Sequence, residues 1–370
     1  MTATIYSGAS VFDGTRLVPG PLRVEDGIVT GPGPGEEVRL DGGSLVPGLL
    51  DLQVNGAGGR MVDGTCSADW LARMCEIHAG LGATGILPTL ITDTPEATAR
   101  VIAAGVEAAR RGTPGFLGLH LEGPHLDPRR KGAHDPALIR PMDDDDLARL
   151  IDAAGRLPSL LVTLAPASVT TDQIARLAAA GVIVSLGHSD CTHAEAQAAI
   201  AAGASCVTHL FNAMSQLGNR DPGLVGAALT GPVHAGLIAD GIHVAPETMR
   251  IAMAASDRLF LVSDAMAAAG SELTEFTLNG RRILRRDGRL TLEDGTLAGA
   301  DLTLPQALGV MLRLGTLPEV ALAMATSRPA ACLRRADTLG HLLPGRTADM
   351  VHLGPDGHLR AVWRGGKRLP

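Results

Sequence analysis

Two histidines and one glutamate are the side chains of this chain best suited to metal chemistry. Glu122, His188 and His209 each come directly after, or at the end of, a mainly apolar run that has the length of a β-strand. One carboxylate with two imidazoles is a ligand set of catalytic Zn²⁺, which keeps a further position open for water. The three residues are far apart in sequence, so their spacing does not prove a shared ion, and a single histidine is more often structural than a metal ligand. Convergence requires that three strands end at one rim.

Asp264 ends a fourth apolar stretch and supplies the acid or base that hydrolysis at such a site requires. Water activated by a metal has to lose a proton, and the leaving group has to gain one. A carboxylate at a strand end can do both. The alternative is a structural role, in which Asp264 caps a helix that begins at Ala265.

The elements that would carry these residues alternate between strands and helices. Eight strands are predicted: Leu45–Gln53, Gly85–Thr89, Gly115–Leu121, Leu160–Ala165, Val182–Gly187, Cys206–Leu210, Gly236–Ala239 and Leu259–Ser263. Ala-rich amphipathic helices are predicted between and after them: Ala68–Leu81, Pro95–Arg111, Asp144–Ala154, Asp172–Ala180, Ala194–Ala202, Pro305–Leu314 and Pro318–Ser327. Residues suited to cap five of these helices are Ser67, Thr94, Asp143, Thr171 and Thr192.

Eight strands alternating with helices indicate the α/β class and a (β/α)8 TIM barrel, whose active site lies at the C-terminal strand ends. An open doubly wound sheet is the alternative. Polar residues at the ends of at least four strands favour the closed barrel, because only a barrel directs that many strand ends toward one point.

Both ends of the chain predict a second, smaller unit. Residues 1–50 contain short strands separated by Asp-Gly and Pro-Gly turns, and residues 341–370 have the pattern of a hairpin. We therefore expect a small β-sandwich domain built from 1–50 and 341–370, with the barrel at 51–340. After Asp264 the alternation lapses, and 276–284 with 288–292 predict a hairpin, followed by a turn-rich segment at 295–299.

Composition excludes several classes of function. The net charge of −7 argues against sequence-independent binding of nucleic acid, which needs a basic surface. The sequence has no apolar run long enough to cross a membrane and no signal-peptide pattern at its start. Its five cysteines are scattered and never form a C-x-x-C pair, so we expect free thiols and a cytoplasmic protein.

A series of motifs then identifies a family. They are His-Leu-Glu-Gly-Pro at 120–124, Lys-Gly-Ala-His at 131–134, Gly-His-Ser at 187–189, Thr-His-Leu-Phe-Asn-Ala-Met at 208–214, Asp-Gly-Ile-His at 240–243, Ser-Asp-Ala-Met at 263–266 and Gly-Thr-Leu-Ala-Gly at 295–299. In this order they resemble the N-acetylglucosamine-6-phosphate deacetylases of the amidohydrolase superfamily. The resemblance covers essentially the whole chain, and the motif at 208–214 is the most specific.

The resemblance implies a role for each matching residue. Glu122, His188 and His209 would bind the metal, Asp264 would be the general acid and base, and His134 would donate to the acetamide carbonyl. Contacts to the sugar phosphate would come from Ala133, His134, Asn212, Ala213, Arg220, His243, Leu297, Ala298 and Gly299. In the family the arginine reaches in from a neighbouring subunit, so a homodimer is expected, with Arg220 as a solvated loop residue the alternative.

One departure from the wider superfamily concerns the number of metals. Two-metal members carry His-x-His at the end of the first strand, where this chain has Gln53 and Asn55. Neutral amides are poor ligands for a second transition metal. We therefore expect one divalent metal per subunit, Zn²⁺ before Fe²⁺ or Mn²⁺. His120 and His125, beside Glu122, are the alternative source of ligands.

The implied function is hydrolysis of N-acetyl-D-glucosamine 6-phosphate to D-glucosamine 6-phosphate and acetate, in amino-sugar catabolism and cell-wall sugar recycling. Residues 126–132 are polar and bounded by Gly and Pro, which predicts a loop that closes over substrate; their cations either steer the phosphate or form an ordinary exposed run. Alternatives are an N-acetylgalactosamine-6-phosphate deacetylase, another N-acyl amidohydrolase, and a catalytically silent regulator that binds a sugar phosphate.

Overall fold

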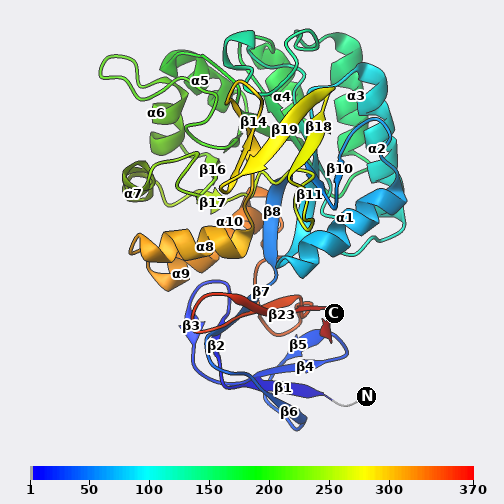
Figure 1. Cartoon of the computed structure of the whole chain (residues 1–370), viewed down its shortest axis with the longest axis vertical. Coiled ribbons are helices and arrows are strands. Elements are labelled where there is room, and N and C mark those ends of the chain that lie inside the picture. Colours follow the sequence, from blue (N-terminus) through cyan, green and yellow to red (C-terminus); the bar gives the residue numbers. More distant parts are fainter. Residues whose placement is uncertain (1–2) are drawn as a thin grey trace.

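The computed structural model describes residues 3–370, and its largest element is an eight-stranded parallel sheet (Figure 1). In sheet order its strands are β17 (Leu259–Leu261), β16 (His234–Leu237), β15 (Cys206–Val207), β14 (Ile183–Leu186), β13 (Leu160–Leu164), β12 (Leu119–Glu122), β11 (Ala83–Ile91) and β8 (Leu49–Val54). The two outer strands meet beyond their ends, where the Asn55 N–H donates to the Ala265 carbonyl at 2.7 Å and the Asp264 N–H to the Gln53 carbonyl at 3.0 Å. These bonds close the sheet into a barrel, which confirms the predicted TIM-barrel class.

Helices cover the outside of the barrel (Figure 1). They are α1 (Ala68–Gly80), α2 (Pro95–Arg110), α3 (Asp144–Ala154), α4 (Thr171–Ala179), α5 (His193–Ala201), α6 (Gly223–Thr230), α7 (Pro246–Ala255), α8 (Leu304–Arg313), α9 (Pro318–Ala325) and α10 (Ser327–Cys332), with a short 3₁₀ helix at Pro128–Arg130. The predicted caps Ser67, Thr94, Asp143 and Thr192 each accept a backbone N–H bond. The prediction for Thr171 is wrong, because Thr170 and Gln173 form the reciprocal capping box one residue earlier.

The first predicted strand, 45–53, is two strands that belong to different sheets. β7 (Ser44–Pro47) pairs with strands of the small β unit, and β8 begins the barrel at Leu49. Gly48 lies between them, where a Cβ would stand 1.8 Å from Thr84 Oγ1, and its N–H donates to the Asp349 carbonyl. The chain thus changes sheets at a glycine, the only residue type that can approach Thr84 so closely.

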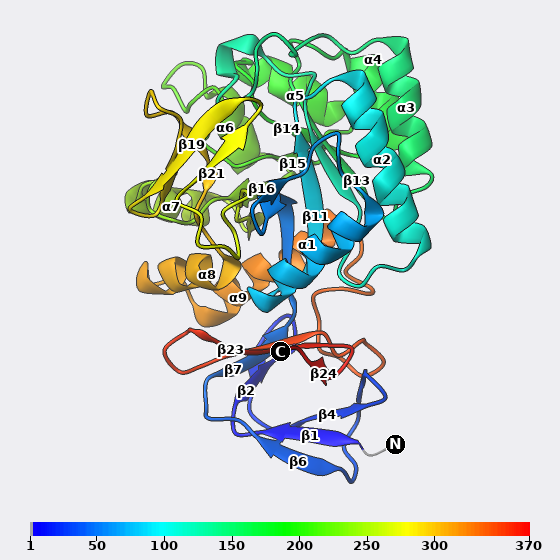
Figure 2. The same ribbon diagram turned by 45° about the vertical axis from the view of Figure 1, so that its right-hand side comes forward.

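Both ends of the chain build a small β unit below the barrel (Figure 2). One sheet has the order β5-β4-β1-β6 and the other β24-β23-β22-β7-β2-β3. Their remaining bounds are β1 (Thr4–Ser7), β2 (Ser10–Phe12), β3 (Leu17–Val18), β4 (Leu22–Glu25), β5 (Ile28–Thr30), β6 (Glu36–Arg39), β22 (Met350–Leu353), β23 (Leu359–Arg364) and β24 (Lys367–Arg368). Tyr6 and Trp363 meet edge to face in the shared core, with ring centroids 5.3 Å apart. The predicted β-sandwich from both termini is confirmed, while its exact domain boundaries stay a prediction.

The excursion after Asp264 is a four-stranded antiparallel sheet on the barrel, away from the small β unit (Figures 1 and 2). Its strands are β18 (Glu275–Leu278), β19 (Arg281–Arg286), β20 (Arg289–Thr291) and β21 (Leu297–Ala300), and a short hairpin, β9 (Gly56–Ala57) with β10 (Arg60–Met61), follows β8. The predicted hairpin is confirmed. The turn predicted at 295–299 is wrong in part, because β21 begins at Leu297 and pairs with β20.

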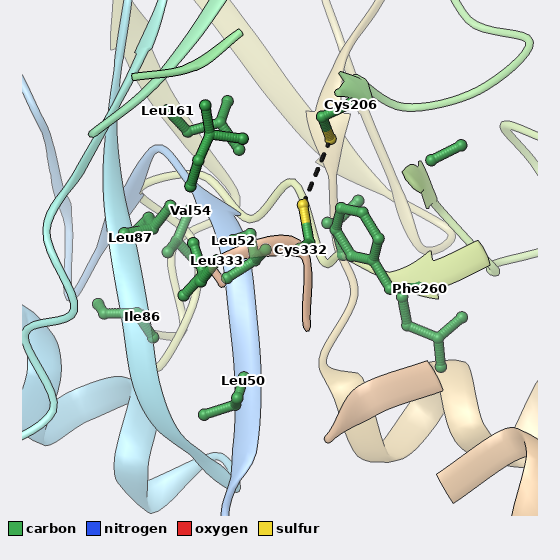
Figure 3. Close-up of a cluster of buried hydrophobic side chains, with 14 of the residues drawn as sticks. Leu50, Leu52, Val54, Ile86, Leu87, Leu161, Cys206, Phe260, Cys332 and Leu333 are labelled. Carbon is green, nitrogen blue, oxygen red and sulfur yellow. Dashed lines mark hydrogen bonds between the residues drawn. The ribbon is translucent and has the colours of Figure 1, made fainter. Parts of the chain in front are cut away.

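Apolar side chains of the barrel strands are buried below the strand ends. Figure 3 shows Leu50, Leu52 and Val54 on β8 beside Ile86 and Leu87 on β11, all of them buried. In a barrel of this kind the active site lies at the C-terminal rim. None of the described helices has the length and apolarity needed to cross a membrane.

Candidate active site

A cavity of about 550 Å³ lies at the C-terminal ends of the barrel strands. Strand ends supply one group of its lining residues and the loop around Ala133 a second. The segment 295–299, which includes the start of β21, supplies a third. The cavity contains Asn55, Glu122, Ala133, His134, His188, His209, Asn212, Ala213, His243, Asp264, Leu297, Ala298 and Gly299. Of the site residues predicted from the sequence, all but Arg220 thus reach one cavity.

Glu122, His188 and His209 meet at the bottom of this cavity. Glu122 Oε1 lies 3.2 Å from His188 Nε2 and 3.0 Å from His209 Nε2, and the two Nε2 atoms are 3.0 Å apart. All three residues are buried, with exposed fractions of at most 5%. The ligands of a tetrahedral Zn²⁺, with bonds of about 2.0–2.1 Å, stand roughly 3.3 Å from each other. The three atoms therefore have the separations that one shared cation requires.

The hydrogen-bond partner of His188 decides which of its ring nitrogens is free. Its Nδ1 lies 2.8 Å from the backbone carbonyl of Arg130, and a carbonyl only accepts, so Nδ1 carries the proton. Nε2 is then left with a lone pair directed at Glu122 and His209. A backbone carbonyl that fixes the tautomer in this way is the usual support of a metal-binding histidine.

His134 stands beside this triangle rather than in it. Its Nε2 is 4.0 Å from Glu122 Oε2, and a looser group of ligand-type atoms, Glu122, His134 and His188, lies within 4.8 Å of one another. The set with His209 is the tighter of the two, and its separations are the ones that a shared ion would impose. Burial acts to raise the pKa of Glu122, but the adjacent His188 and His209 outweigh burial and hold this pKa well below its usual range.

The surroundings of His134 make its Nε2 a hydrogen-bond donor. Nδ1 lies 2.7 Å from the Thr92 hydroxyl and 3.3 Å from the Thr92 backbone N. Because a peptide N–H only donates, Nδ1 is the acceptor, the hydroxyl can donate to it as well, and the ring proton is on Nε2. Burial lowers the pKa of His134 well below its usual value, and the nearby His188 lowers it further, so the ring stays neutral. A neutral Nε2–H that lines the cavity can donate to a carbonyl oxygen.

Asp264 lies beyond the end of β17 and is buried, with an exposed fraction of 8%. Its φ of 50° is in the left-handed region, and its N–H and carbonyl are bonded to Gln53 and Ala300. Burial raises the pKa of Asp264 to about 6, and the Glu122 charge adds to the rise. The structural alternative for this residue is wrong, because Ala265 enters a β-bridge with Val54 and no described helix begins there.

Sequence reasoning missed three buried partners at the end of β8. Gln53 Nε2 donates to Glu122 and Asp264, and Asn55 Nδ2 donates to Asp264. The carboxylate of Asp51 accepts the Ser263 N–H at 3.1 Å. The sequence shows polar residues at every second position of a strand, which indicates one face, but their partners lie between 69 and 212 residues away.

The predicted sugar-phosphate residues differ in their surroundings. His243 Nδ1 bonds to Asp240 at 2.6 Å, and Asn212 Nδ2 donates to the carbonyls of His209 and Leu210. Arg220 is exposed and is not among the residues that line the cavity. The structure of this single chain therefore does not bring Arg220 to the site.

The predicted loop 126–132 borders the cavity through two arginines. Arg129 bonds to Asp127, and Arg130 donates to Asp190 at 2.7 Å. Lys131 is not a lining residue. Arg281 of β19 donates to the Ala133 carbonyl, which ties the four-stranded sheet to the end of this loop.

The alternative ligands His120 and His125 point elsewhere. His120 bonds to Thr89 and Thr163 inside the barrel, and His125 bonds to the Arg140 carbonyl. Among the residues that the structure describes, the group of ligand-type side chains at this rim includes neither histidine. They do not add ligands for a second ion.

Several known proteins are similar to this chain over nearly its whole length. The model of the amidohydrolase family matches residues 44–369. An N-acetylgalactosamine-6-phosphate deacetylase of Shewanella sp. (strain ANA-3) is 39% identical over 381 residues, which cover 99% of this chain and 95% of that protein.

Two solved structures are similar over their whole length. The N-acetylglucosamine-6-phosphate deacetylase of Pasteurella multocida has a TM-score of 0.95 and 31% identity, with 99% of each chain covered. An aspartate-to-alanine variant of the Mycobacterium smegmatis N-acetyl-D-glucosamine-6-phosphate deacetylase, in complex with N-acetyl-D-glucosamine 6-phosphate, has a TM-score of 0.91 and 32% identity, covering 100% of this chain and 99% of that one.

Proposed function

We propose that this chain, which belongs to the amidohydrolase family, is a hydrolase that removes the acetyl group from an N-acetylhexosamine 6-phosphate. The products are acetate and the amino sugar phosphate, and the preferred substrate is N-acetyl-D-glucosamine 6-phosphate. The observation that carries the proposal is the meeting of Glu122, His188 and His209 beside a buried aspartate in one cavity.

The metal requirement follows from the donor set. One divalent ion per subunit, Zn²⁺ in preference to Fe²⁺ or Mn²⁺, would be held by Glu122, His188 and His209. When bound, it supplies Lewis acidity toward the acetamide and lowers the pKa of water. The lone pair left on His188 Nε2 by the Arg130 carbonyl supports this assignment.

Proton transfer belongs to Asp264. Its carboxylate takes a proton from the attacking water and returns it to the departing amine nitrogen. His134 donates through Nε2–H to the acetamide oxygen and stabilises the negative charge that develops there. Both groups line the same cavity, which supports a single reacting centre.

The phosphate end of the substrate would be bound by cations around the cavity mouth. His243 lines the cavity, as do Arg129 and Arg130. Arg220 would reach the cavity of a second copy in a homodimer, since it is exposed on its own chain. Ala133, Asn212, Ala213 and the segment Leu297–Gly299 would contact the sugar. A role in amino-sugar catabolism and cell-wall sugar recycling, in the cytoplasm, completes the proposal.

Acetate release tests the function directly. The purified protein is incubated with the 6-phosphates of N-acetylglucosamine and N-acetylgalactosamine and with both unphosphorylated sugars, with and without a chelator. We expect chelator-sensitive release from a phosphorylated sugar, with a kcat/KM at least about 100-fold above that of the free sugar, because the free sugar makes none of the phosphate contacts. Equal kcat/KM for both forms would indicate another N-acyl amidohydrolase.

The epimer is the second question of the same experiment. The Shewanella relative is an N-acetylgalactosamine-6-phosphate deacetylase, so the galacto substrate is the competing candidate. A higher kcat/KM for the galacto epimer would assign that activity instead. Tight binding of either sugar phosphate without any acetate release would indicate a binding regulator.

A further inference from the structure

We infer that Gln53 and Asn55 form an amide clamp that orients Asp264 for proton transfer, holding one of its carboxylate oxygens and leaving the other for the reaction. The inference rests on the proposed function and adds two positioning residues to it. Both amides are buried, with exposed fractions of 2% for Gln53 and 1% for Asn55. Their position at the end of β8 places them between Glu122 and Asp264.

Both amide nitrogens bond to the same oxygen of Asp264. Asn55 Nδ2 donates to Oδ1 at 2.6 Å, and Gln53 Nε2 donates to Oδ1 at 3.2 Å. Among the described residues, nothing is hydrogen-bonded to Oδ2 of Asp264. Two donors therefore occupy one oxygen, and Oδ2 is the atom left to take a proton from water.

The backbone holds the same three residues in register. The Asp264 N–H donates to the Gln53 carbonyl at 3.0 Å, and the Asn55 N–H donates to the Ala265 carbonyl at 2.7 Å. Asp264 has a left-handed φ of 50°, a conformation that a side chain tolerates only where surrounding contacts impose it. The clamp thus acts on a carboxylate whose main chain is already fixed.

Gln53 also separates two carboxylates. Its Nε2 donates to Glu122 Oε1 at 3.1 Å as well as to Asp264 Oδ1, so its two amide hydrogens lie between the acids. A cation that bridged these acids would need that position. An amide N–H₂ group has no lone pair to offer a metal, so Gln53 fills the place of a second ion with hydrogen-bond donors.

Asn55 has one further group that the fold leaves unused. Its Oδ1 is buried, has no hydrogen-bond partner within residues 3–370, and belongs to a residue that lines the cavity. A buried acceptor without a partner calls for an explanation. Because Nδ2 of the same amide is bonded to Asp264, Oδ1 lies beside the base, and we assign it to the second hydrogen of the attacking water.

Substitutions that keep volume and remove the donors test the clamp. In Gln53→Met and Asn55→Leu we expect kcat to fall about 10- to 100-fold, as for other residues that orient the groups around a metal, while KM changes less than about 3-fold. Gln197→Met on α5 is the matched control and should match the parent, since its amide bonds only to His193. Thermal unfolding of each variant verifies folding.

Two readouts separate positioning from a general structural role. In Asn55→Leu the acid limb of kcat/KM should move to higher pH, because loss of a donor to the Asp264 carboxylate disfavours its charged form. Asn55→Asp restores an acceptor at this position without the N–H, so it should not restore the parent kcat. Metal content, which needs no substrate, should rise from one to two ions per chain in the double variant Gln53→His with Asn55→His.

The inference is overturned if folded Gln53→Met and Asn55→Leu retain the parent kcat and pH profile, or if only KM changes. A double histidine variant that still binds one ion overturns the role of Gln53 in filling the second position. These results are distinct from a failure of the proposed function, in which the parent enzyme itself would release no acetate from any sugar phosphate.

Discussion

Asp264 combines the burial and the charge environment of a general base that works near neutral pH. Its pKa of about 6 is raised by burial first and by the Glu122 charge second. A raised pKa brings a carboxylate closer to the pH at which it must both accept and return a proton. A cation bound by Glu122, His188 and His209 would favour the charged form, so the loaded enzyme has its acid limb at or below about pH 6.

Asp264→Asn tests this assignment. We expect kcat to fall by at least about 100-fold, because an amide oxygen does not accept a proton, and the acid limb of the pH profile to disappear with it. Activity is measured between pH 5 and 9 at saturating metal, and metal content and thermal unfolding serve as controls. Turnover within a few-fold of the parent would show that another group is the base.

Asp51 is a second buried carboxylate, and it makes stability depend on pH. Burial raises its pKa from 3.8 to about 7, against the opposing bond from the Ser263 N–H. The folded state therefore holds a proton that the unfolded state releases, so this contribution to stability is full below about pH 4 and is lost as pH rises toward 7.

Asp51→Asn should remove this dependence, because an amide oxygen still accepts the Ser263 N–H but does not titrate. We expect the free energy of unfolding of the variant minus that of the parent to increase by about 2 kcal/mol from pH 5 to pH 8. Urea unfolding at both pH values gives this difference, which also cancels the titration of all shared groups. A difference independent of pH would contradict the raised pKa.

Single residues were predictable from the sequence where one strand sufficed to place them. Glu122, His188 and His209 end apolar stretches, and a barrel brings such ends together without further information. The bonds from Gln53 and Asn55 to Asp264 were not predictable, because they depend on how the first and last barrel strands meet across more than 200 residues. The tautomer of His188 was not predictable for the same reason, because it is set by the backbone carbonyl of Arg130.

Among the elements, β12 shows how glycine sets the length of a site strand. The sequence predicts 115–121, whereas β12 begins at Leu119 and reaches Glu122. Gly118 has a φ of 133°, and a Cβ there would stand 1.9 Å from the Ser159 carbonyl oxygen on the neighbouring segment. This close approach fixes the start of the strand and, four residues later, the position of Glu122.

Gly118→Ala should therefore destabilise the protein by about 2–4 kcal/mol, from backbone strain and the clash with Ser159. The measurement is a urea or thermal unfolding curve compared with that of Gly80→Ala. Gly80 ends α1, has ordinary φ and has no atom within 4 Å of its Cβ position, so this control should be neutral or slightly stabilising. Equal stability of the two variants would mean that the β12 segment shifts at no cost.

Helices with a capping side chain were predicted well, and three described helices without one were missed. α2 and α3 have capping side chains and one apolar face, and their predicted bounds agree with the structure to within one residue. α6 is buried from Gly223 to Leu229 and has no side-chain cap, so it lacks the periodicity that distinguishes a helix from a strand. α7 and α10 were also missed.

At the scale of the whole molecule, the alternation of strands and helices sufficed for the barrel, and short strands at both ends sufficed for the small β unit. The change of sheet at Gly48 was not predictable, because it depends on Thr84 and Asp349 from other elements. A single chain also leaves the phosphate end of the proposed site without Arg220, which lies in the exposed stretch 216–221.

The role of Arg220 decides whether the proposed site is shared between two copies. Leu217 in the same stretch is 57% exposed, and an exposed large apolar residue beside an arginine is a combination found at protein interfaces. If the stretch crosses to a partner, its guanidinium can bind the substrate phosphate there. If it does not, Arg220 is a solvated charge and its removal has no effect on KM.

Mixed dimers decide between these possibilities. Arg220→Ala and Asp264→Asn are coexpressed with different tags, and the heterodimer is purified. One of its sites then combines an intact Asp264 with the Arg220 of the Asp264→Asn subunit, and the other carries both defects. We expect about half the parent kcat/KM per dimer, although each homodimer has a low kcat/KM. If Arg220 serves its own chain, both heterodimer sites are defective and activity stays at the level of the homodimers. A protein that remains monomeric at assay concentration would contradict the shared site altogether.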